Sequence, residues 1–214
     1  MRSAPLIFDL DGTLFQTESA TVPAVQDTFR DAGLEVPSTE LILDFIGSPM
    51  SELAKWVQSV CGDRDADELM RLIDAKEMAL AKSIGQLFPK VIDVLESLRR
   101  DYEALAICTN GGPEYAGTII DSQGIRHFFD VVRCRANELD NKPAIVAEII
   151  GNLGLTEGVV TLDRREDVEA AKRNSLRAMG AGYGYGSGDE VKEADVVAHA
   201  ASEIPDLIAQ VLDS

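Results

Sequence analysis

Short apolar runs alternate with segments of helical periodicity along most of the 214-residue chain. Helical spacing of apolar residues is clear in residues 91–98 and 145–153. Strands are predicted where short apolar runs contain β-branched residues: Leu6–Phe8, Ala104–Cys108, Val131–Val132, Val159–Leu162 and Val196–Ala198. Strands that alternate with helices predict an α/β fold, in which a Rossmann-like, doubly wound parallel sheet carries helices on both faces.

Residues 16–87 interrupt this alternation, because apolar positions recur there with helical spacing only. Four helices are expected in this segment, and Ser48 followed by Pro49 is a favourable start for the third. We therefore predict an α/β core domain from residues 1–15 and 88–214 and a small α-helical cap domain from residues 16–87. The cap is expected to follow the first strand and to close over its carboxyl end.

Glycine occupies every second position from Gly180 to Gly188. This spacing differs from the G-x-G-x-x-G of dinucleotide-binding turns, so a nucleotide site is not predicted here. A short strand or loop whose backbone lies close to another segment is the simpler interpretation.

Composition narrows the class of protein. With 45% hydrophobic residues the chain can bury a core, and no apolar stretch is long enough to cross a bilayer. The first residues lack the features of a secretory signal. The three cysteines lie far apart and are expected to be reduced thiols in a cytoplasmic protein.

The net charge of −17 disfavours nucleic acid and anionic membranes as partners, because both require a basic surface. Only two histidines are present, so His-rich zinc sites and Ser-His-Asp triads have few candidates. Catalytic chemistry is therefore expected to depend on carboxylates.

Asp9 and Asp11 follow the first apolar run directly and lead into a glycine turn at Gly12. In an extended chain, residues two apart point to the same side, so both carboxylates can act at one place. Two acids at the end of a buried strand are costly unless their charge is compensated. A divalent cation is the simplest compensation, because hard cations prefer oxygen ligands.

Polar residues follow other predicted strands in the same way. Thr109 and Asn110 come after the second strand, Lys142 stands at a predicted helix start, and Asp163 and Asp167 come after the fourth strand. Hydroxyl, amide and ammonium groups at such positions suit an anionic oxygen. Ligands of open parallel sheets bind at the carboxyl ends of the strands, so these residues are expected to share one site.

This set of motifs resembles the haloacid dehalogenase superfamily, and most closely its phosphoglycolate phosphatase-like branch with a helical cap after strand one. The resemblance covers essentially the whole chain, and the four motifs occur in order: Asp9-Leu10-Asp11-Gly12-Thr13, Thr109-Asn110, Lys142-Pro143 and Asp163…Asp167. The segment from Tyr183 to Ser187 also resembles that branch.

The resemblance implies a phosphatase that cleaves a small-molecule phosphomonoester through an aspartyl-phosphate. Asp9 would be the nucleophile. Asp11 would protonate the leaving oxygen and then activate water.

The resemblance further implies a bound Mg²⁺ and a phosphate-binding group. The metal ligands would be the Asp9 carboxylate, the Asp11 backbone carbonyl and Asp163, with Asp167 as a ligand or as support for one. The phosphoryl oxygens would be held by the motif residues Thr109, Asn110 and Lys142.

Three positions depart from the family pattern. Leu162 stands where glycine usually precedes the fourth-motif aspartate, and Gln16 replaces an aspartate often found at the hinge into the cap. Gly111-Gly112 leaves the second-motif loop without its common lysine. None of these departures removes a required catalytic group.

Other activities stay open. Asp11 argues against a true dehalogenase, and a phosphonatase would need a cap lysine, for which Lys55, Lys76 and Lys82 are available. A phosphosugar mutase of the β-phosphoglucomutase type is the main enzymatic alternative; a non-catalytic interaction protein with this fold is the other. Residues 15–87 carry 13 acidic and 6 basic residues, a balance that weakly disfavours a doubly phosphorylated substrate.

The motifs do not identify the substrate, which is expected to be a small phosphorylated metabolite. Phosphoglycolate, a sugar phosphate, a nucleotide and pyrophosphate are all reachable through variation in the cap. Glu18 and Ser48 are the candidate substrate contacts in the cap. We expect a monomer or a homodimer.

Overall fold

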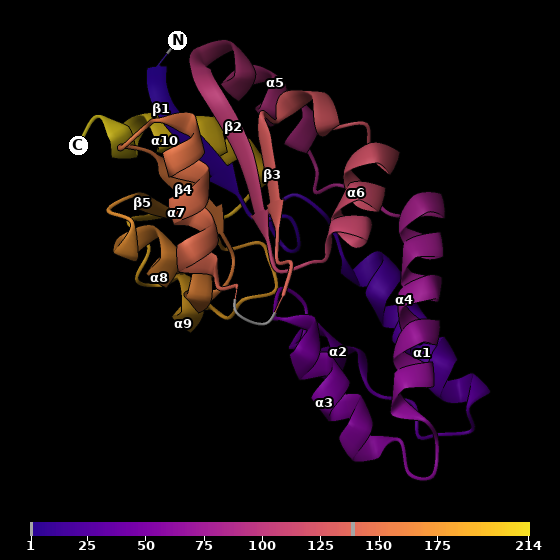
Figure 1. Cartoon of the computed structure of the whole chain (residues 1–214). Helices are drawn as coiled ribbons and strands as arrows, with labels where there is room; N and C mark the ends of the chain where they lie inside the picture. The colour runs from indigo at the N-terminus through magenta and orange to yellow at the C-terminus, as the bar shows by residue number, and fades with distance from the viewer. Residues whose placement is uncertain (1, 138–139) are drawn as a thin grey trace.

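In the part of the chain that the structure describes, six parallel strands form one sheet in the order β3-β2-β1-β4-β5-β6 (Figure 1). The computed structural model describes residues 2–137 and 140–214. The strands are β1 Arg2–Phe8, β2 Tyr102–Thr109, β3 Val131–Cys134, β4 Val159–Leu162, β5 Arg177–Ala181 and β6 Val196–Ala198. The chain order reverses beside β1, which lies between β2 and β4, so the carboxyl end of β1 is the point where this sheet type binds ligands.

Helices cover both faces of the sheet. The helices are α1 Glu18–Asp31, α2 Thr39–Leu43, α3 Met50–Val60, α4 Ala66–Ser83, α5 Val91–Asp101, α6 Pro113–Ser122, α7 Lys142–Leu153, α8 Arg165–Arg173, α9 Gly188–Val191 and α10 Ile204–Leu212. Two short 3₁₀ turns lie at Arg126–Phe128 and Ala201–Glu203. Leu6 and Phe8 pack with α5, α6 and α10, whereas Ile7 packs with α7 and α8. Alternating residues of β1 thus enter opposite cores, as a strand buried on both faces requires.

Helices α1 to α4 form a separate layer beyond the carboxyl ends of the strands (Figure 1). They bury an apolar core of their own, in which Phe29, Val57 and Ile73 are fully or almost fully enclosed. The two connections to the sheet are tied together: the Gln16 backbone N–H donates to Gln86 O at 2.8 Å, and Gln16 Nε2 donates to Leu87 O at 2.7 Å. Gln16 therefore links the chain segments on both sides of this helical layer.

The sheet and its parallel arrangement confirm the α/β prediction, with two local differences. β5 was not predicted as a separate strand, because its sequence Arg-Ala-Met-Gly-Ala contains no β-branched residue. Helix α3 begins at Met50 with Pro49 as its N-cap, one residue later than expected from Ser48. The Ser48 backbone N–H instead donates to Phe45 O and closes a turn after α2.

Within residues 2–137 and 140–214, no helix combines the length and the apolar character needed to cross a bilayer.

Candidate active site

Three adjacent strands deliver the polar residues of the site. Asp9 follows β1, Thr109 ends β2, and Asp163 follows β4. Phe8 pairs with Ile107 on one side and with Thr161 on the other, so the three strands end at nearly the same level. The Asp9 backbone N–H donates to Thr161 O at 2.9 Å and continues the ladder by one residue.

Three buried carboxylates converge at this point. Asp9, Asp163 and Asp167 each place one oxygen within 4.8 Å of the others. Each of the three residues also has a buried side-chain oxygen that accepts no hydrogen bond: Asp9 Oδ2, Asp163 Oδ1 and Asp167 Oδ2. A buried oxygen without a donor carries a desolvation cost, which a coordinated cation removes. The donor set fits a hard divalent ion such as Mg²⁺, for which carboxylate oxygens are the preferred ligands.

The charge of these carboxylates is incompletely compensated by the protein. Burial raises the pKa of Asp9, Asp163 and Asp167 to about 7 in each case. Neighbouring carboxylates contribute to this rise in pKa, and the nearby Lys142 opposes it. A cation bound among the three would favour their ionised forms.

Lys142 is completely buried beside the nucleophile candidate. Its Nζ lies 2.9 Å from Asp9 Oδ1, forms an ion pair with Asp167 and donates to Cys108 O at 3.4 Å. Burial alone would lower the Lys142 pKa, but the Asp167 and Asp9 carboxylates hold it well above its usual value. The side chain extends from the first turn of α7, where Asn141 caps the helix by accepting from Ala144 N. Lys142 is thus a fixed positive charge at the end of β1.

The glycine-rich loop after β5 lies against Asp163. Asp163 Oδ2 accepts hydrogen bonds from the backbone N–H groups of Tyr185 at 2.9 Å and Gly186 at 3.3 Å. A Cβ atom at Gly186 would collide with the Asp163 backbone oxygen. Gly12, with φ of +73°, has no room for a Cβ either, because Asp163 lies there. The interpretation that these alternating glycines permit close backbone approach is confirmed at Gly184 and Gly186, whereas a Cβ at Gly188 would meet nothing within 4 Å.

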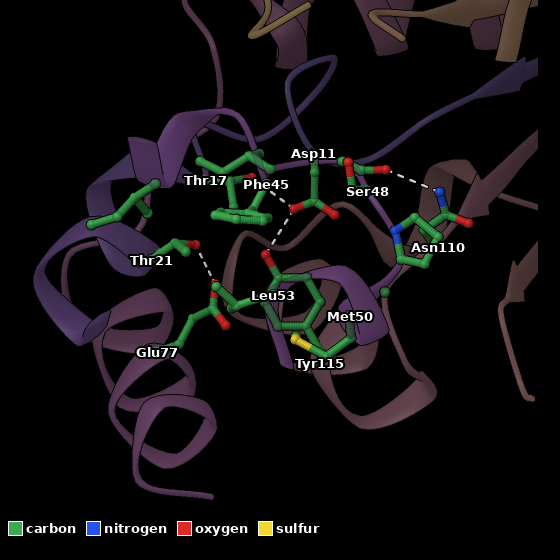
Figure 2. A pocket seen from close by; sticks show the side chains of 15 residues that line it. Asp11, Thr17, Thr21, Phe45, Ser48, Met50, Leu53, Glu77, Asn110 and Tyr115 are labelled. Atoms are coloured by element: carbon green, nitrogen blue, oxygen red, sulfur yellow. Dashed lines mark hydrogen bonds between the residues drawn. The ribbon is translucent and has the colours of Figure 1, made fainter. Parts of the chain in front are cut away.

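Asp11 lies apart from the three converging carboxylates and faces the helical layer (Figure 2). Its Oδ1 accepts hydrogen bonds from Thr17 Oγ1 and Tyr115 OH, both at 2.7 Å, and its Oδ2 lies 3.5 Å from Thr109 Oγ1. Burial raises the Asp11 pKa, and the hydrogen bonds from Thr17 and Tyr115 oppose that rise. A carboxyl group with a raised pKa and directed hydrogen bonds suits proton transfer.

The family model for haloacid dehalogenase-like hydrolases matches residues 6–181, which include the carboxylates of this site, Lys142 and Thr109. The chain belongs to this family. The hydrolase is also similar to curated proteins over most of its length. It is 28% identical over 203 residues to the tyrosine-protein kinase PtkA of Mycobacterium tuberculosis, covering 92% of this chain and 69% of that protein. It is 26% identical over 209 residues to the phosphoglycolate phosphatase of Yersinia pestis, covering 92% and 90%.

Solved structures share the fold of the hydrolase. A predicted phosphoglycolate phosphatase from Haemophilus somnus superposes with a TM-score of 0.88 at 22% identity, covering 97% and 98% of the two chains. A haloacid dehalogenase-like hydrolase from Streptococcus pneumoniae gives 0.82 at 24% identity, covering 96% and 98%. A candidate β-phosphoglucomutase from Thermotoga maritima gives 0.80 at 20% identity, covering 97% and 99%. At these identities the likeness shows the fold alone.

The second-motif residues of the hydrolase connect the sheet to the helical layer. Thr109 is completely buried, and its Oγ1 accepts from Gly111 N at 3.0 Å. Asn110 Nδ2 donates to Gly47 O at 3.0 Å and to Glu166 Oε2 at 3.2 Å. Asn110 therefore holds the loop before α3 against the ends of the strands.

The two candidate substrate contacts of the hydrolase lie in different places. Ser48 lines a pocket that also contains Asp11, between the helical layer and the sheet (Figure 2). Glu18 does not line it; the Glu18 backbone N–H donates to Tyr185 OH at 3.1 Å, next to the glycine-rich loop. The structure thus brings Ser48, but not Glu18, to this pocket.

Two pocket residues of the hydrolase were not predicted. Tyr115 on α6 reaches Asp11, and Glu77 on α4 is buried in the helical layer. Glu77 stands four residues after Ile73, on the stripe of α4 that packs inward. A carboxylate on an otherwise apolar stripe was the available signal for Glu77. Tyr115 carried no comparable signal in the sequence.

Proposed function

We propose that the protein is a Mg²⁺-dependent phosphatase that hydrolyses a small phosphomonoester through an aspartyl-phosphate at Asp9. The observation that carries this proposal is the convergence of Asp9, Asp163 and Asp167 beside the buried Lys142. Such a site combines a nucleophilic carboxylate, ligands for a cation and a fixed positive charge for phosphoryl oxygens. Phosphoglycolate phosphatases among the similar proteins support hydrolysis of a phosphomonoester.

In the first step, an Asp9 carboxylate oxygen attacks phosphorus and the bond from phosphorus to the leaving oxygen breaks. Asp11 gives its proton to that leaving oxygen. In the second step, Asp11 takes a proton from water as the water oxygen attacks phosphorus. The bond between phosphorus and Asp9 then breaks, which releases inorganic phosphate and restores both carboxyl groups.

Other residues hold the reacting groups in place. Asp9, Asp163 and Asp167, together with the Asp11 backbone carbonyl, would bind Mg²⁺. When bound, this ion supplies positive charge against the phosphoryl oxygens. Lys142, Thr109 and Asn110 would contact the same oxygens. Residues 16–87 would act as the cap that shields the reaction from bulk water.

A phosphosugar mutase has weaker support. A mutase of this type must hold a second phosphate at the cap, which calls for a basic side chain. Among the described residues that line the pocket at Asp11, none is lysine or arginine. This observation favours water over a second phosphorylated group as the acceptor.

The direct test is phosphate release from p-nitrophenyl phosphate with and without Mg²⁺. Mg²⁺-dependent release by the wild type and its loss in Asp9→Asn are expected. Absence of release from every phosphoester in a broad panel would refute the proposal.

A further inference from the structure

A small pocket joins Asp11 to a second buried carboxylate. The pocket has a volume of about 60 Å³ and lies where α2, the loop before α3 and α4 face the ends of the strands (Figure 2). Apolar side chains form much of its wall: Ile42, Phe45, Ile46, Met50 and Leu53. Glu77 contributes a carboxylate to the same pocket. Because Asp11 is the proposed proton donor to the leaving oxygen, this space is suited to the leaving group of the substrate.

The Glu77 carboxylate lacks a compensating positive charge. Its side chain is only 4% exposed and accepts a hydrogen bond from Thr21 Oγ1. In the described part of the chain, no lysine, arginine or histidine lies within ion-pair distance of Glu77. Burial, helped by the Asp11 and Asp74 carboxylates and opposed by the Thr21 hydrogen bond, raises the Glu77 pKa to about 7. Burying a carboxylate without a cation costs stability, so this residue fits a role toward a ligand better than a role in packing.

Two basic side chains belong to a neighbouring cleft that shares Pro49, Met50 and Asn110 with this pocket. Lys55 and Arg135 line a larger and more open space that also touches Asn110 but does not include Asp11. Lys55 pairs with Glu52 at 2.8 Å, and Arg135 donates to Asn110 Oδ1 at 3.3 Å. An anionic leaving group in the pocket at Asp11 would therefore meet Glu77 instead of a cation.

We infer that the substrate is the phosphomonoester of a small amino alcohol, whose ammonium group donates to Glu77 while its ester oxygen lies at Asp11. This inference rests on the proposed phosphatase function and names the substrate class of the same site. Hydrolysis breaks the bond between phosphorus and the ester oxygen, consumes one water and releases the amino alcohol and inorganic phosphate. The aromatic rings of Phe45 and Tyr115 in the pocket also favour a cation.

The charge of Glu77 limits the choice of leaving group further. The glycolate group of phosphoglycolate carries a carboxylate, which Glu77 would repel across a poorly hydrated space. A neutral hydroxyl could donate to Glu77 but would leave its charge uncompensated.

Three esters of equal length test this inference: phosphoethanolamine, 2-hydroxyethyl phosphate and phosphoglycolate. They end in an ammonium, a hydroxyl and a carboxylate, respectively. With Mg²⁺ present, the wild type should give kcat/KM in that order, with a preference of roughly tenfold or more for the ammonium over the hydroxyl.

Glu77→Gln keeps the shape and the acceptor for Thr21 but removes the charge. This variant should lose about tenfold or more in kcat/KM for phosphoethanolamine and gain for phosphoglycolate. Glu68→Gln is the matched control, because Glu68 lies on the same helix, pairs with Arg71 on its surface and does not line the pocket. It should keep the wild-type order of the three esters.

The outcomes separate the inference from the proposed function. If neither p-nitrophenyl phosphate nor any of the three esters is cleaved, the phosphatase proposal itself fails. If p-nitrophenyl phosphate is cleaved but phosphoglycolate or 2-hydroxyethyl phosphate is preferred over phosphoethanolamine, only the inference about the amino alcohol is overturned. An unchanged order of the esters in a folded Glu77→Gln variant would overturn it as well. If that variant does not fold, the wild-type order of the three esters decides.

Discussion

The Tyr115 hydroxyl donates a 2.7 Å hydrogen bond to Asp11 Oδ1, the oxygen that also accepts from Thr17. Tyr115 belongs to the helix after β2, whereas Thr17 belongs to the segment that enters the helical layer. Two separate elements thus fix one carboxylate oxygen, and Figure 2 shows both hydrogen bonds. Tyr115 is a positioning residue for the proposed proton donor.

Tyr115→Phe removes one of these donors. Because the Tyr115 hydrogen bond lowers the Asp11 pKa, its loss should raise that pKa. Asp11 must carry a proton to protonate the leaving oxygen, so the alkaline limb of the kcat/KM profile should move to higher pH. The value of kcat should fall roughly three- to tenfold as Asp11 loses orientation. The pH dependence of 2-hydroxyethyl phosphate hydrolysis measures both effects, because its alkoxide leaving group requires a proton.

Tyr183→Phe is the control for a purely structural effect. Tyr183 OH donates to Thr13 O at 2.9 Å and makes no hydrogen bond to Asp11. This variant should lose stability without a shift of the pH profile. A Tyr115→Phe profile that coincides with the wild type would remove Tyr115 from the positioning of Asp11.

Lys142→Met tests the buried positive charge between Asp9 and Asp167. The substitution leaves two buried carboxylates without their partner, so the free energy of unfolding should fall by about 3–5 kcal/mol. Adding Asp167→Asn removes one of those charges and should restore part of the loss. Urea unfolding of the single and double variants gives the two values. Equal stability of Lys142→Met and the wild type would contradict the ion pairs found in the structure.

Stability of the metal-free protein should fall as pH rises from about 4 to about 7. The carboxyl groups of Asp9, Asp163 and Asp167 have pKa values near 7 when folded, against 3.8 for an ordinary aspartate. Between these values the folded state holds more protons than the unfolded state, which gives stability a negative slope with pH. The contribution is fully present below the unfolded pKa and is lost above the folded pKa.

Mg²⁺ should reverse this loss, because it binds the ionised carboxylates. The rise in Tm on adding Mg²⁺ should therefore be small at about pH 5.5 and larger at about pH 8.5. Thermal unfolding at matched ionic strength measures it, with Asp163→Asn as the variant expected to lose most of the effect. A Mg²⁺ shift of equal size at both pH values, or an undiminished shift in Asp163→Asn, would argue against a metal site at these residues.

Gly186→Ala should damage the contact between the glycine-rich loop and Asp163. Its added methyl group would collide with the Asp163 backbone oxygen, so the free energy of unfolding should fall by about 1–3 kcal/mol. Mg²⁺ affinity should weaken too, because Gly186 N–H donates to Asp163 Oδ2. Gly188→Ala is the matched control, since a Cβ there meets nothing within 4 Å. Similar losses in both variants would mean that the contact with Asp163 is not the cause.

The sequence predicted the sheet and the motif residues because each depends on local pattern. The apolar run 6–8 followed by Asp9 and Asp11 is visible without any contact, and parallel strands bring their carboxyl ends together. Tyr115 could not be predicted in the same way, because its role depends on how α6 packs beside Asp11. β5 was not predicted as a strand for a local reason. Its buried residues are mostly small and include none of the β-branched residues that mark the other strands.

The substrate contacts could be predicted least. Glu18 and Ser48 lie similarly close to predicted turns, yet only Ser48 lines the pocket at Asp11. The angle between the helical layer and the sheet decides which of them reaches it, and sequence periodicity carries no information on that angle.

The aspartyl-phosphate at Asp9 is tested most directly by a burst experiment with Asp11→Asn and p-nitrophenyl phosphate. Nitrophenolate leaves without a proton, so this variant should still form the intermediate but should hydrolyse it slowly. We predict a rapid release of about one nitrophenolate per chain, followed by slow turnover, with the phosphoryl group found on Asp9 by mass spectrometry after acid quenching. Linear release without a burst and without phosphorylated Asp9, while the wild type turns over, would contradict a covalent intermediate at this residue.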